Sequence, residues 1–235
     1  ASGLVIHDET AQAWRSGSIY LVLALLAESV LLVGLVMLAG EIPGDSLRLR
    51  DAAAALATSP DRDLIMALLV AGFGTKAGLV PMHVWMPLAH AAAPVPASAV
   101  LSGAVVKVGI IGLIRFLPLS EALPGWGLVL TAVGFVTAFY AVAIGLTQRH
   151  PKAVLAYSSV SQMGVVAAVL GMGLAAGDAT SGMAAAFYAS HHVLVKGALF
   201  LSVGVIAASG AGRRAVVLVP AMLLCLGLGG LPFTG

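Results

Sequence analysis

The sequence predicts an all-α polytopic membrane protein of about seven transmembrane helices, one of them broken by proline. Of the 235 residues, 60% are hydrophobic and only 9% are charged, and the mean hydropathy is +1.05. Soluble domains carry about 25% charged residues, so a water-soluble globule of this composition would lack the polar side chains to cover its surface. Apolar runs also recur at the length of about 20 residues that crosses a bilayer core.

Composition excludes several other classes of protein. The net charge of +2 includes no basic patch large enough to neutralise a run of phosphates, so no nucleic-acid partner is expected. The one cysteine, Cys225, excludes a disulfide within the chain and a cysteine-rich zinc or iron–sulfur site. No metal and no cofactor is therefore expected.

Residues 1–17 form a polar N-terminal segment that lacks the basic region and apolar core of a signal peptide. The chain has no initiator Met, and its last residues, GLGGLPFTG, lie inside a hydrophobic run. We therefore expect residues 18–235 to be part of a membrane domain that is truncated at both ends.

The apolar runs give the spans in order. The first covers 18–40, and a polar connection follows over 41–63. The second runs over 64–80 and breaks at Pro81, because proline removes a helix hydrogen bond and clashes with the preceding turn. The piece at 82–93 is too short to cross, so we expect a half-helix inside the protein or near the interface. The remaining spans are 97–117, 126–147, 153–175, 181–208 and 215 to the end.

Basic residues in short loops favour one orientation. Arg149, Lys152, Arg213 and Arg214 all fall at the end where the first span begins, whereas the loops 118–125 and 176–180 at the other end hold no Lys or Arg. The 41–63 connection adds three arginines at that other end. The positive-inside rule still favours the N-terminal end of the first span as cytoplasmic.

Three lysines lie at depths where hydrocarbon is expected: Lys76, Lys107 and Lys196. A lysine at the centre of a span costs about 2.5–3.5 kcal/mol on insertion scales, so such residues usually serve an ion pathway. Snorkelling of a long side chain to the interface explains Arg115, near the end of its span. It explains Lys107 and Lys196 poorly, because apolar sequence extends on both sides of each.

Other polar groups accompany these lysines. His192 and Lys196 are spaced i, i+4 and share a helix face with Tyr188 one turn earlier, which suits a proton relay. Glu28 is the only acid deep in a span, and it is either the charge that tunes a lysine or one half of a structural ion pair. Trp85 is explained by interfacial anchoring, and His83 and His90 are candidates of lower weight.

Three ordered motifs resemble one family. They are the run from Lys76 through Pro81, His83, Trp85, Pro87, His90 and Pro94 to Ala99; KAVLAYSSVSQMG at 152–164; and HHVLVKGALFL at 191–201. Together they resemble the antiporter-like membrane subunits of respiratory complex I, Mrp sodium/proton antiporters and membrane-bound hydrogenases. The resemblance covers 18–235.

The resemblance implies a fold of about fourteen transmembrane helices with two inverted five-helix repeats, each with a broken helix. Lys76 matches the family's broken-helix lysine, Lys107 the bridging lysine, and Lys196, with His192, the lysine near the outlet. The family's glutamate partner lies on a helix before 18–40, so Glu28 departs from the pattern. The charged residue of the second broken helix is expected beyond Gly235.

The resulting hypothesis is proton translocation by an antiporter-like subunit of a complex I-type, hydrogenase-type or Mrp-type complex in an inner, energy-transducing membrane. The expected relay is Lys76, Lys107, Lys196, His192, Glu28 and Tyr188, with Pro81 as the helix break. Expected partners are other membrane subunits, H⁺ and the lipid bilayer. Any redox chemistry belongs to the complex, because this chain shows no redox site. A Na⁺/H⁺ antiporter subunit like Mrp D and a non-conducting structural subunit remain as alternatives.

Overall fold

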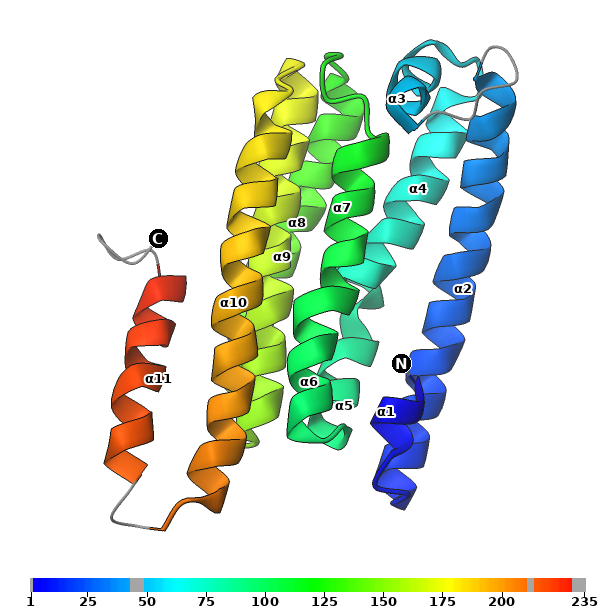
Figure 1. Ribbon diagram of the computed structural model, residues 1–235. Coiled ribbons are helices and arrows are strands. Elements are labelled where there is room, and N and C mark those ends of the chain that lie inside the picture. The colour runs from blue at the N-terminus through cyan, green and yellow to red at the C-terminus, as the bar shows by residue number, and fades with distance from the viewer. Residues whose placement is uncertain (1, 43–48, 211–213, 230–235) are drawn as a thin grey trace.

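The computed structural model describes residues 2–42, 49–210 and 214–229, which form a bundle of roughly parallel helices without strands (Figure 1). Six segments of the described chain are long and apolar enough to cross a membrane: Ala11–Glu41, Arg62–Ala92, Val95–Phe116, Pro124–Gly145, Pro151–Ala176 and Thr180–Ala208. The prediction of an all-α polytopic membrane protein is confirmed.

Two of these segments are composite. Arg62–Ala92 contains α4 (Arg62–Ala77), the short η1 (Met82–Val84) and α5 (Trp85–Ala92). Val95–Phe116 contains α6 (Val95–Val100), the π-helical η2 (Leu101–Val105) and α7 (Val106–Phe116). The other elements are α1 (Ser2–Ile6), α2 (Ala11–Glu41), α3 (Leu49–Thr58), α8 (Pro124–Gly145), α9 (Pro151–Ala176), α10 (Thr180–Ala208) and α11 (Arg214–Leu228).

The first and last predicted spans differ from the observed helices in their bounds. Helix α2 begins at Ala11, inside the polar segment 1–17, because the Thr10 hydroxyl accepts a hydrogen bond from the Ala13 N–H at 3.1 Å and caps the helix. The seventh expected span is represented by α11, whose 15 residues are shorter than a full crossing and lie at the edge of the bundle beside α10 (Figure 1). Residues 230–235 of that span lie outside the described residues.

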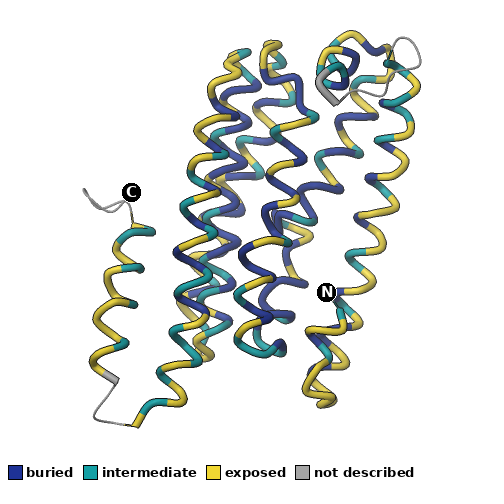
Figure 2. The backbone as a smooth tube through the Cα atoms, in the orientation of Figure 1, coloured by how far each residue is buried: buried dark blue, intermediate teal, exposed yellow. Residues whose placement is uncertain are grey.

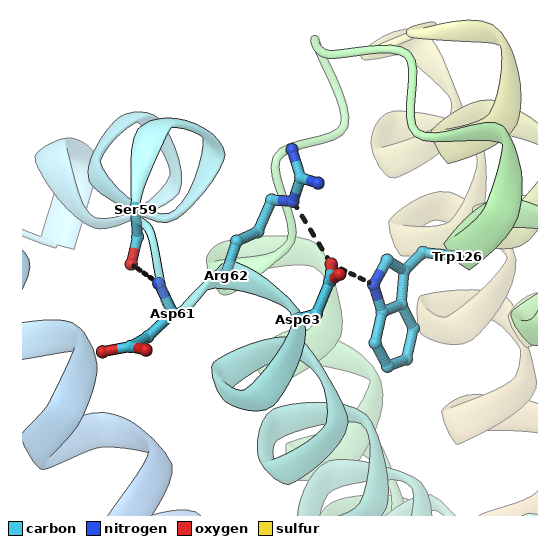
Figure 3. A network of polar contacts seen from close by, with 5 residues as sticks. All are labelled: Ser59, Asp61, Arg62, Asp63 and Trp126. Carbon is cyan, nitrogen blue, oxygen red and sulfur yellow. Dashed lines mark hydrogen bonds and ion pairs between the residues drawn. The ribbon is translucent and has the colours of Figure 1, made fainter.

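The segment 41–63, which the sequence predicted only as a polar connection, contains a helix. Helix α3 buries Ala52 and Leu56 against its neighbours. After it, Ser59 Oγ accepts the Asp61 N–H at 3.0 Å, and Asp63 receives the Trp126 indole N–H at 2.9 Å and lies 3.4 Å from Arg62 Nε (Figure 3). This network joins the first residues of α4 to those of α8 at one end of the bundle.

The α9–α10 turn lies at the same end of the bundle (Figure 1). Thr180 donates its N–H and its hydroxyl to Asp178, at 2.9 and 2.7 Å, and these bonds hold the pKa of the Asp178 carboxyl below its usual value.

Exposed side chains on the outer helices are apolar. Figure 2 shows exposed positions along the outward sides of α2, α10 and α11, whereas buried positions gather toward the middle of the bundle. Leu32, Phe139 and Leu194 are 63%, 73% and 75% exposed. Large apolar surfaces of this extent are rare on soluble monomers and suit contact with lipid or with other membrane helices.

Helices α8 and α9 pack with their backbones in close contact. A Cβ added at Gly134 would lie 2.5 Å from the Ala168 nitrogen and 2.7 Å from the Gly164 oxygen. A Cβ at Gly164 would meet the Ala138 nitrogen at 2.6 Å. Small residues allow membrane helices to approach this closely, since apolar side chains gain little there from leaving lipid. The pair α8–α9 is therefore a rigid support for the residues that follow.

We expect Gly134→Ala to lower the free energy of unfolding by about 1–3 kcal/mol, because the added methyl group overpacks the contact. The measurement is thermal unfolding of the full subunit in detergent. Gly125→Ala on the same helix is the control, since a Cβ there meets nothing within 4 Å. Equal stability of the two variants would contradict this packing.

Candidate functional site

The first part of the candidate site is the break between α4 and α5. Helix α4 ends at Ala77, Gly78 adopts the left-handed conformation with φ +79°, and the chain turns through Leu79, Val80 and Pro81 before η1. Glycine suits this position because it has no Cβ to clash at positive φ. The half-helix α5 then runs inside the protein: Trp85, Met86, Ala89 and His90 are all buried.

The backbone groups freed by the break have side-chain partners. The Trp85 indole N–H donates to the Thr75 carbonyl at 2.8 Å, and the Val80 N–H donates to the Thr137 hydroxyl of α8 at 3.0 Å. An unsatisfied backbone group inside a membrane costs several kcal/mol. Trp85 is only 3% exposed, so the prediction that it anchors at the membrane interface is wrong. Its indole instead ties the half-helix to the end of α4.

The second part of the site is a contact between Lys107 on α7 and His192 on α10. Lys107 Nζ lies 2.6 Å from His192 Nδ1 and donates to the Ser102 carbonyl at 2.7 Å. The two side chains are 4% and 0% exposed. A lysine ammonium only donates, so with Lys107 protonated the ring nitrogen Nδ1 is the acceptor. The contact thus joins two groups that can each hold a proton.

The π-helical turn η2 makes the Ser102 carbonyl free for this lysine. In an α-helix the Val106 N–H would donate to Ser102 O, but here it donates to Leu101 O, five residues back. Next to it, Ser102 Oγ and Ser159 Oγ of α9 share a hydrogen bond at 3.1 Å. The irregular turn therefore supplies an oxygen for a buried ammonium that has no carboxylate within ion-pair distance among the described residues.

Lys196 and Tyr188 lie on α10 with His192, but each has its own partner on α9. Lys196, which is fully buried, donates to the Leu155 carbonyl at 3.0 Å, and the Tyr188 hydroxyl donates to Gln162 Oε1. Within the described part of the chain, no hydrogen bond joins Tyr188, His192 and Lys196 directly. A proton passing along this face would need water between the groups.

Lys76 pairs with Glu28. Its Nζ lies 2.9 Å from Glu28 Oε1 on α2, and the side chains are 21% and 60% exposed. A cavity of about 20 Å³, enough for one water molecule, is lined by Lys76, Tyr20, Trp85 and Val105. Val105 is the last residue of η2, the turn whose Ser102 carbonyl accepts Lys107. This cavity therefore lies between the ion pair and that turn.

Two buried histidines, His90 and His83, lie in the half-helix region. His90 is fully buried, stacks on Phe200 of α10 at a centroid distance of 4.7 Å, and lies within electrostatic reach of Lys107, Lys152 and Lys196. Neither ring nitrogen of His90 has a hydrogen-bond partner among the described residues. Buried polar atoms are normally hydrogen-bonded, so these two nitrogens are free to bond a water molecule.

His83 is the second of these histidines. Its ring contacts Tyr140 edge-on at 5.1 Å, and its Nδ1 also lacks a protein partner. Both histidines were candidates in the sequence, and the structure places His83 in η1 and His90 in α5.

Within the ranges that the structure describes, no three His, Cys, Asp or Glu side chains gather as ligands for a metal ion. The polar interior is instead built from lysines, histidines, hydroxyl groups and backbone carbonyls. Such groups can carry protons from one to the next and hold water, which is the chemistry that the geometry supports.

A family model described as "NADH:quinone oxidoreductase/Mrp antiporter, TM" matches residues 2–235. The chain belongs to this family. It is 37% identical over 219 residues to an uncharacterized protein of Mycobacterium tuberculosis, with 88% of this chain and 33% of the relative covered. It is 31% identical over 217 residues to hydrogenase-4 component B of Escherichia coli, with 86% and 32% covered. The chain thus spans about a third of the length of these relatives.

Solved structures show the same fold. A chain of the Mrp complex from Dietzia sp. superposes with a TM-score of 0.79 at 24% identity, over 95% of this chain and 43% of that chain. At this identity the likeness shows the fold alone, namely that of an antiporter-like membrane subunit.

Proposed function

We propose that this chain is part of a proton-translocating, antiporter-like subunit of a larger complex in an energy-transducing membrane. The observation that carries the proposal is the buried contact of Lys107 with His192, with Lys196 one helical turn further on. Desolvation disfavours the charged form of a lysine, which helps a buried lysine to release its proton. An imidazole at hydrogen-bond distance is suited to receive it.

The proposed path has three groups of residues. Glu28 and Lys76 form an ion pair at the helix break. Lys107 exchanges a proton with His192. Lys196 continues the path one turn after His192 on α10, Tyr188 lies one turn before His192, and water connects these groups. The drive comes from elsewhere in the complex, either electron transfer or an ion gradient, because the residues described here carry protons and no electrons.

Relatives supply the candidates for that complex. The family model names NADH:quinone oxidoreductase and Mrp antiporters, and one relative is a hydrogenase component. We propose that other membrane subunits cover part of the exposed apolar surface of the helices, and that H⁺ is the transported ion. Transport of Na⁺ by the same subunit and a purely structural role are the rival functions.

We expect Lys107→Ala and Lys196→Ala, each in the full subunit within its complex, to reduce proton flux into proteoliposomes by about 100-fold, the lower end of what a positioned proton-transfer group contributes. Arg115→Ala is the control, because Arg115 is an exposed residue near the end of α7 and outside the path. Flux measured with and without Na⁺ separates the antiporter alternative. Normal assembly with unchanged flux in both lysine variants would favour the structural role.

Glu28→Gln keeps the shape of the side chain and removes the charge that faces Lys76. We expect coupled transport to fall several-fold while assembly stays normal, because the Lys76 ammonium loses its ion-pair partner. Glu41→Gln at the end of the same helix is the matched control. Transport at the wild-type level in Glu28→Gln would assign Glu28 to packing.

A further inference from the structure

A polar cavity opens between α5 and α9, at the end of the bundle where α2 begins and where the turn between α8 and α9 lies (Figure 1). Its volume is about 380 Å³, which is room for several water molecules. Its lining includes Gln12, Leu88, Ala91, Gln148, His150 and Tyr157. Polar side chains from three elements therefore surround a space that reaches the half-helix from outside the bundle.

Lys152 lies in the first turn of α9, one residue before Ala153, which lines this cavity. The Lys152 side chain is partly exposed, and its ammonium donates to the Ala93 carbonyl at 2.6 Å. Ala93 is fully buried and immediately follows α5. The carboxylate of Asp8, before α2, acts electrostatically on the same ammonium. Lys152 thus reaches from the solvent-facing end of α9 to the buried end of the half-helix.

His90 lies in the last turn of α5, three residues before Ala93. The Ser98 hydroxyl bridges the carbonyls of His90 and Ala93, at 3.1 and 3.4 Å, so both ends of this short turn are fixed in place. The charges of Lys196, Lys107 and Lys152 all act electrostatically on His90. On α9, Leu155, whose carbonyl accepts Lys196, is one turn after Lys152. His90 is therefore a buried imidazole on which the charge of Lys152 and the charges of Lys107 and Lys196 all act.

We propose that Lys152 is the proton port of the path, exchanging protons between water in this cavity and the buried imidazole of His90. The inference rests on the proposed function. In one direction the Lys152 ammonium releases a proton, through water, to a neutral ring nitrogen of His90, and the resulting amine takes a proton from hydronium in the cavity. The reverse transfer returns the proton to the cavity. Protons on Lys107 and Lys196 thereby reach the end of the bundle that carries Arg149.

The competing role for Lys152 is structural, since its bond to Ala93 ties α9 to the half-helix. Arginine separates the two roles. It keeps the positive charge and can donate to the same carbonyl, but it does not release its proton in proteins. In the full subunit within its complex, we expect Lys152→Arg to assemble normally and to lose about 100-fold of the proton flux.

Three outcomes decide this test. In the first outcome, Lys152→Arg has wild-type flux while Lys107→Ala and Lys196→Ala still lose theirs. This result overturns the role of Lys152 as the port and leaves the proposed function standing. Wild-type flux in the Lys107 and Lys196 variants overturns the proposed function and the port together. If Lys152→Arg fails to assemble, Lys152→Met is measured: assembly with wild-type flux overturns the port, and assembly with lost flux supports it.

The cavity has an independent test that does not depend on transport. In a Cys225→Ala background, Ala91→Cys places a thiol on its wall, Ala89→Cys places one in the core of the same half-helix, and Leu128→Cys places one on the apolar outer surface. A membrane-impermeant, charged thiosulfonate should modify Ala91→Cys much faster than the other two. Modification of Ala91→Cys no faster than Leu128→Cys would show a dry cavity and overturn the port.

Discussion

The short contact between the Lys107 ammonium and the His192 imidazole is the interaction on which the polar interior depends. A buried lysine needs partners that offset its lost hydration, and among the described residues Lys107 has a ring nitrogen and one backbone carbonyl. That carbonyl is available because η2 shifts a helix hydrogen bond by one residue. The π-helical turn, the position of α10 against α7 and the burial of both side chains are therefore parts of one arrangement.

The helix break between α4 and α5 imposes a second constraint, since its freed backbone groups need hydrogen-bond partners. The break and the Lys107–His192 contact both border η2. Thr137 and Trp85 satisfy the backbone groups that the break frees, and both are fixed by packing on α8 and against α2. The close packing of α8 on α9 then holds Ser159 and Leu155, whose oxygen atoms face Ser102 and Lys196. Polar groups on five helical segments are thereby placed by contacts between small or apolar residues.

Much of the fold was predictable because lipid demands long apolar segments, and those are visible in a single sequence. The depth of Lys107 and Lys196 followed from the same runs. Their partners did not, because Lys107 and His192 are 85 residues apart and belong to spans whose mutual rotation is set by packing. Glu28 was left open between the charge that tunes a lysine and one half of a structural ion pair, and in the structure it lies 2.9 Å from Lys76. Whether the pair tunes Lys76 or only stabilises the helices is decided by transport.

Other features were missed for identifiable physical reasons. The π-helical turn has no compositional signal, since it depends on tertiary contacts. Trp85 looked like an interfacial anchor because tryptophan is common at membrane surfaces, yet here its N–H is needed inside, at a broken helix. His90 was given little weight because a lone histidine on an apolar segment says nothing about which lysines surround it.

The most direct measurement of the central claim is a double-mutant cycle on proton flux, using Lys107→Ala, His192→Leu and the double variant in the reconstituted complex. Residues that act as one unit show non-additive effects. If Lys107 and His192 pass the same proton, the double variant should be about as slow as the slower single variant. If their effects on the free energy of activation add, the two residues act separately and the account of a shared relay is contradicted.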